Sequence, residues 1–77
     1  MLKNRYTYSG LPTETLIART VEMIHEHETD GIPHREAVAL ALEWMPLRVV
    51  RAWAADVLLN GAPSSWSKAR LIAEVTK

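Results

Sequence analysis

The chain has 77 residues and no cysteine, so it forms at most one small domain, without disulfide bonds or a cysteine-based zinc site. Hydrophobic residues make up 48% of it and charged residues 23%, a balance typical of a globular protein rather than a disordered one. Lys and Arg number 9 and Asp and Glu number 9, and this zero net charge excludes a polybasic or polyacidic tail protein. An enzyme is not expected, because so short a chain cannot easily form both a core and a cleft.

Residues 1–12 are predicted to form a flexible N-terminal arm, and residues 13–77 a single helical domain. The arm contains the basic residues Lys3 and Arg5 and a turn signal at Ser9-Gly10. No apolar run follows Met1, so a secretory signal is not expected. No stretch approaches the ~18 apolar residues of a membrane span, and a cytoplasmic location is the default expectation.

The first helix is predicted from Glu14 to Glu28, with Thr13 as its N-cap. Apolar side chains recur there at helical spacing, which indicates an amphipathic helix. Its expected core face consists of Leu16, Ile17, Thr20, Val21, Met23 and Ile24. Asp30-Gly31-Ile32-Pro33 is predicted to end this helix and lead into the next.

Two helices are predicted around Pro46, the first from Pro33 or His34 to Trp44 and the second from Leu47 to Leu59. The expected core residues of the first are Ala37, Val38, Leu40, Ala41, Leu42, Trp44 and Met45. The width of this apolar face predicts a central position in the domain. The expected core residues of the second are Leu47, Val50, Trp53, Val57 and Leu58. Gly61 is predicted to take the left-handed conformation just after this helix.

The last helix is predicted from Ser65 to Val75, with Ser64 or Ser65 as its cap. A β-strand over residues 69–76, as in a small wing, is the alternative, because Leu71-Ile72 and Val75-Thr76 favour strands. The Ala, Glu, Lys and Arg content of the segment favours the helix. The fold class is therefore all-α, a compact domain of three or four helices.

No catalytic or cofactor-binding pattern is present in the sequence. Ser64, Ser65 and Ser67 have no nearby histidine, and the chain has no glycine-rich phosphate loop. His25 and His27 are two residues apart on a predicted helix, so they point in different directions and cannot share a metal ion. The sequence therefore predicts no cofactor and no metal site.

The segment around Pro46 carries the pattern that points to a function. It reads REAVALAL from Arg35, then EWMP, then LRVVRAW ending at Trp53. This resembles a helix-turn-helix DNA-binding unit, in which an alanine-rich helix, a short turn and a helix of the form x-x-V-x-x-W follow one another. The resemblance covers residues 34–60 only. The turn has no glycine, and the spacing from Leu42 to Trp53 is one residue longer than in the commonest form of the family.

The resemblance implies a small protein that binds double-stranded DNA, as a transcriptional regulator or recombination accessory factor of a phage or mobile element. The helix from Leu47 would enter the major groove. At 100° per residue its outward face holds Arg48, Ala52, Ala55 and Leu59, with Arg51 and Asp56 at the edges. Small residues let the backbone approach the bases, and long donors reach base edges or phosphates. Further expected contacts are Arg35, Lys68 and Arg70 on phosphates, and Lys3 and Arg5 in a minor groove.

A protein partner or a second copy of the chain is the alternative ligand. A face of arginine and alanine also lets another helix approach closely. The three tryptophans are expected to be core residues, because the chain has no phenylalanine. If they are instead exposed, Trp44 and Trp66 would be binding anchors together with Leu59.

Overall fold

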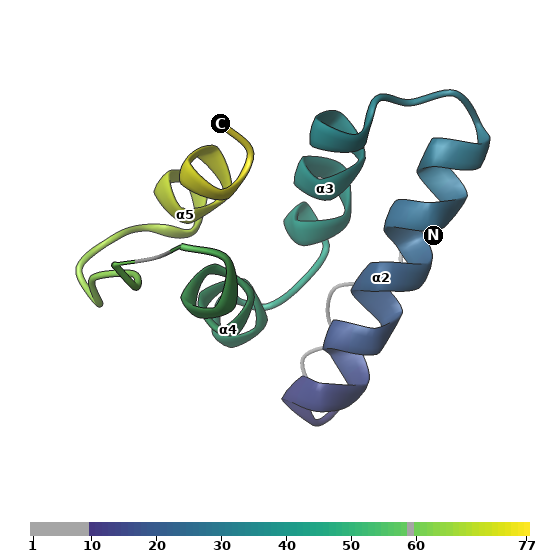
Figure 1. The fold of residues 1–77 in the computed structure, drawn as a ribbon. Helices are drawn as coiled ribbons and strands as arrows, with labels where there is room; N and C mark the ends of the chain where they lie inside the picture. The colour runs from purple at the N-terminus through teal and green to yellow at the C-terminus, as the bar shows by residue number, and fades with distance from the viewer. Residues whose placement is uncertain (1–9, 59) are drawn as a thin grey trace.

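A computed structural model describes residues 10–58 and 60–77, and within them the fold is all-α, as the sequence predicts (Figure 1). The helices are α2 (Thr13–Thr29), α3 (His34–Glu43), α4 (Leu47–Val57) and α5 (Lys68–Val75). Residues 1–9 of the predicted arm and Leu59 lie outside the described residues.

A proline stands at the N-cap of each of the first three of these helices. Pro12, Pro33 and Pro46 have φ between −57° and −65° and ψ between 148° and 158°, an extended conformation that leads directly into a helix. The fixed φ of proline and its missing N–H make it suitable at a helix start. The prediction that Thr13 is the N-cap of α2 is wrong, because Pro12 holds that position and Thr13 is the first helical residue.

The connection between α4 and α5 is longer than the sequence predicts. α4 ends at Val57, and Leu58 has an extended backbone with φ −89° and ψ 127°. Gly61 has the expected positive φ of 74°, but it lies within the loop rather than directly after the helix. α5 begins at Lys68, because Ser67, and not Ser64 or Ser65, accepts a hydrogen bond from the Arg70 N–H at 3.1 Å.

The alternative of a β-strand over residues 69–76 is wrong, since α5 occupies most of that segment. Leu71 and Ile72 are its buried residues, whereas Ala69 and Ala73 are exposed. Two adjacent buried residues with exposed neighbours on both sides suit the narrow apolar stripe of a short surface helix.

The helices pack around one hydrophobic core. α2 contacts α3 and α4, and α5 contacts α4 and α3. In Figure 1, α3 lies between α2 and α5, and α4 is seen nearly end-on below it, so α4 crosses α2 and α3 steeply. Every helix contributes to the core, whose largest fully buried side chains are Leu16, Thr20, Leu42, Met45, Val49, Val50 and Leu71.

The buried face of α4 differs from the predicted one. Val49, Val50 and Ala54 are fully buried, whereas Leu47 is 39% and Val57 51% exposed. Leu47 and Val57 are the first and last residues of α4, and because the helix crosses its neighbours steeply, its neighbours do not cover these two side chains. The small side chain of Ala54 lets the neighbouring helices approach closely.

The tryptophans lie at the edge of the core rather than inside it. Trp53 and Trp66 are partly buried and pack against the core, but Trp44 is 42% exposed, contrary to the expectation of a buried residue. Leu40 and Val21, also expected in the core, are exposed as well. The core is therefore filled mainly by aliphatic side chains, which suits the close packing of short helices.

Leu42 and Leu40 provide a matched pair for testing this core. We expect Leu42→Ala to lower the free energy of unfolding by about 2–5 kcal/mol, because Leu42 is fully buried. Leu40→Ala, on the exposed side of the same helix, should cost much less. Urea denaturation followed by circular dichroism measures both, and equal losses would contradict the assigned core face.

Candidate nucleic-acid interface

The outer face of α4 is defined by what its inner face buries. Because Val49, Val50 and Ala54 are turned into the core, Arg48 and Ala55 are exposed on the opposite side and Ala52 is partly exposed. Asp56 is also exposed, at the edge of this face. Leu59, which was predicted on the same face, lies outside the described residues and beyond the end of α4.

Arg48 ties the first turn of α4 to the start of α2. Its guanidinium donates to the Thr13 Oγ1 at 2.7 Å and also to the Leu11 carbonyl oxygen. Both acceptors are neutral, so these bonds hold the side chain without neutralising its charge. They also hold Leu11 beside the N-terminal end of α4.

Arg51 ties the middle of α4 to the loop before α5. Its Nη2 donates to the Ser64 carbonyl oxygen at 2.8 Å and lies 3.4 Å from the Trp66 carbonyl oxygen. Its Nε is buried without a hydrogen-bond partner in the described part of the chain. Arg48 and Arg51 therefore reach to opposite flanks of α4, and Ala52 and Ala55 lie one turn further along the same face.

Two further predicted cations lie near the start of α5. The Lys68 Nζ donates to the Glu43 carbonyl oxygen at 2.7 Å, which joins α5 to the end of α3. The Arg70 guanidinium stacks over the Trp66 ring, 4.4 Å from its centroid, and its Nε lies 3.4 Å from a carboxylate oxygen of Glu74. Trp66 is thus held between its carbonyl contact with Arg51 and its ring contact with Arg70.

Glu74 is bound by the C-terminal residue as well. The Lys77 ammonium lies 3.0 Å from the Glu74 carboxylate. This hydrogen bond to Lys77, followed by the charges of Lys77 and Arg70, holds the pKa of Glu74 below its ordinary value of 4.5, although some desolvation opposes the effect. Arg70 and Lys77 therefore share one carboxylate.

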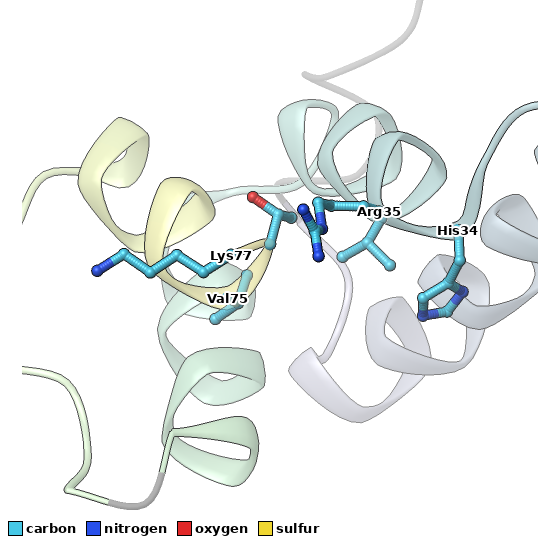
Figure 2. A pocket seen from close by; sticks show the side chains of 6 residues that line it. His34, Arg35, Val75 and Lys77 are labelled. Carbon is cyan, nitrogen blue, oxygen red and sulfur yellow. The ribbon is translucent and has the colours of Figure 1, made fainter.

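Arg35 lies apart from the α4 surface, at the end of α3 that is remote from the turn to α4. It lines a hollow of about 180 Å³ together with His34, Val38, the last residue of α5 and the two residues that follow it. Figure 2 shows its guanidinium pointing toward the end of α5, whereas the side chains of Lys77 and His34 point away in different directions. His34 instead contacts the Glu28 carboxylate of α2. The basic groups of this hollow do not converge on one point.

The sequence-predicted residues thus fall into separate groups. The structure brings Arg48, Ala52, Ala55 and Arg51 together on α4 and places Lys68 and Arg70 beside the loop that Arg51 contacts. It leaves Arg35 at the other end of α3, and Lys3 and Arg5 lie outside the described residues. Trp44 and Trp66, predicted as anchors for a protein partner, are exposed and partly buried, respectively.

Sequence reasoning missed an apolar groove between α2 and α4. It has a volume of about 200 Å³ and is lined by Ile17, Trp53, Asp56 and Val57. The apolar residues among these were all predicted to be core residues. Their helical spacing correctly places them on apolar faces of α2 and α4. Part of this apolar surface stays uncovered because α4 ends at Val57.

In the described ranges, no helix is both long and apolar enough to cross a membrane. The same residues contain no group of three or more His, Asp or Glu side chains that could hold a metal ion. No family model matches the chain, and no similar protein was found among curated proteins or solved structures.

Arg48 is expected to stabilise the fold through its contacts with Leu11 and Thr13. Arg48→Gln should lower the free energy of unfolding by about 1–2 kcal/mol, because a charged donor to both residues is lost. Arg35→Gln removes the same charge from an exposed site and should cost less than about 0.5 kcal/mol. Thermal or urea denaturation compares the two variants, and a loss of stability in Arg35→Gln alone would contradict the role of Arg48.

Glu74 should titrate below pH 4.5 in the folded protein, and Lys77→Ala should raise its pKa toward that value. A lowered folded-state pKa means that ionised Glu74 stabilises the fold above about pH 4.5 and that this contribution is lost as the pH falls through the lowered pKa. Carboxyl-carbon NMR titration of both proteins measures the pKa. Identical values in the two proteins would show that Lys77 is not the main cause.

Proposed function

We propose that this protein binds double-stranded DNA by inserting α4 into the major groove, in the manner of a helix-turn-helix protein. The observation that carries the proposal is the outer face of α4. It presents the small residues Ala52 and Ala55 one turn along from Arg48 and Arg51, on a helix that crosses α3 steeply after a short turn. The major groove, about 12 Å wide, admits a helix whose exposed residues are small.

The contacts of the two arginines support this use of the surface. The bonds to Leu11, Thr13, Ser64 and Trp66 end on neutral oxygens, which orient a guanidinium without cancelling its charge. Phosphate backbones run along both sides of a groove, and a cation on each flank suits them. Both arginines would then bind chiefly to phosphates and orient the helix. The base edges would contact the surface formed by Ala52 and Ala55.

Neighbouring basic residues extend the proposed contact. Lys68 and Arg70 stand beside the loop held by Arg51 and would contact the DNA backbone. The minor-groove contact expected of Lys3 and Arg5 stays a prediction from the sequence, because both residues lie outside the described residues. Arg35 is remote from α4 and would serve a separate phosphate contact at most.

The zero net charge limits what one protomer can do. With so few cations and an acidic Asp56 on the same helix, a single copy should bind DNA weakly and lose affinity steeply with salt. Tight binding to a specific site would need two protomers on adjacent half-sites, or a second bound protein. Such a protein would serve as a transcriptional regulator or as an accessory factor in recombination.

The proposal predicts that a negative charge on α4 abolishes DNA binding without disturbing the fold. Ala55→Glu places a carboxylate on the exposed face and breaks no observed contact. Ala18→Glu, on the exposed side of α2, makes the same change elsewhere. Fluorescence anisotropy of a labelled duplex at about 50 mM salt should show at least tenfold weaker binding for Ala55→Glu only.

The unmodified protein should also lose affinity sharply between about 50 and about 200 mM salt, because phosphate contacts release counterions. Absence of binding at the lower salt concentration would refute DNA as the ligand. Equal losses in Ala55→Glu and Ala18→Glu would instead indicate general charge repulsion and remove α4 as the contact surface.

A further inference from the structure

The groove between α2 and α4 is a second surface, distinct from the outer face of α4. Trp53 and Val57 line it from α4, and Ile17 lines it from α2. Val57 is 51% exposed although it is a large apolar residue, and Trp53 is only partly buried. A volume of about 200 Å³ is enough to receive one large apolar side chain.

Helix geometry makes this groove a regular surface. Trp53 and Val57 are four residues apart and so lie one above the other on α4. Ile17 has Val21 one turn further along α2, and Val21 is 53% exposed. The backbone leaves the helical conformation at Leu58, so α4 does not continue over the groove. Apolar residues on two neighbouring helices, here Trp53 and Val57 on α4 and Ile17 on α2, form the kind of surface into which an amphipathic helix packs.

The charge at the groove indicates what such a helix must carry. Asp56 is the one charged residue among those that line the groove, and it is exposed. It has no ion-pair partner in the part of the chain that the structure describes, unlike Glu22, Glu26, Glu28 and Glu74. A basic residue beside the apolar anchor of a partner would pair with Asp56, whereas an acidic residue there would be repelled.

We infer that this groove docks an amphipathic helix of another protein, with an apolar side chain in the groove and a lysine or arginine opposite Asp56. The inference does not depend on DNA binding, because the groove shares none of its lining residues with the contacts proposed for DNA. A protein of this size could use one surface for DNA and the other for a partner protein.

The test uses the full chain and two synthetic probes. One is a short amphipathic peptide with a leucine stripe flanked by lysines, and the other is the same peptide with glutamates in place of the lysines. Titration into the ¹⁵N-labelled protein, followed by NMR, should shift the amide resonances of Ile17, Trp53 and Val57 with the lysine peptide. The glutamate peptide should bind at least about fivefold more weakly.

Two variants and one control identify the contact. Val57→Ser should weaken binding of the lysine peptide about tenfold, and Leu40→Ser, which removes a similarly exposed apolar residue from α3, should leave it unchanged. Asp56→Lys should reverse the preference, so that the glutamate peptide binds about fivefold more tightly than the lysine peptide.

Three outcomes would overturn the inference. The first is absence of shifts at about 1 mM lysine peptide, the weak limit of specific binding. The second is an unchanged charge preference in Asp56→Lys, which would mean that Asp56 does not select the partner. The third is a shift of the groove resonances with protein concentration alone, which would make a second copy of the chain the occupant.

Discussion

The burial of one narrow stripe of α4 determines which surfaces of this helix remain exposed. Val49, Val50 and Ala54 are fully buried in the core shared by the other helices. Because only these three residues of α4 are fully buried, its opposite face is exposed, and so are Leu47 and Val57 at its two ends. The face with Arg48 and Ala55, and the apolar end at Val57, are both consequences of this one packing arrangement.

The two arginines of α4 connect fold and surface. A guanidinium can donate several hydrogen bonds in a fixed plane, so it can hold a neighbouring segment while its charge remains. Arg48 does this toward the start of α2, and Arg51 toward the loop before α5. The segments on either side of α4 are therefore held in place by the same side chains that give this surface its positive charge. A lysine in either place would keep the charge but not this geometry.

The molecule thus has two surfaces of different chemistry on one helix. The outer face of α4 is small and flanked by cations, whereas the groove toward α2 is apolar with a single carboxylate. Asp56 stands between them and is unfavourable for phosphates but suitable for a basic partner. The two surfaces therefore favour ligands of opposite charge, because the Asp56 carboxylate weakens a contact with phosphates and strengthens one with a basic partner.

Much of the fold was predictable from local rules. Prolines 12, 33 and 46 mark helix starts because they fix φ and lack an N–H, and apolar periodicity marks most buried residues of α2 and α3. The arginines and alanines of α4 were likewise recognisable from their projection around the helix. Sequence alone thus determined the all-α class, the approximate helices and the outward position of Arg48 and Ala55.

Only the tertiary structure decided which apolar residues are covered. Periodicity shows that Leu47, Trp53 and Val57 belong to apolar faces, but burial depends on where neighbouring helices cross, which is a property of distant segments. The steep crossing of α4 and its end at Val57 leave Leu47 and Val57 exposed and create the groove. The partners of Arg48 and Arg51, thirty-seven and thirteen residues away for Leu11 and Ser64, were likewise beyond local rules, because hydrogen bonds between distant segments form only once the helices are packed.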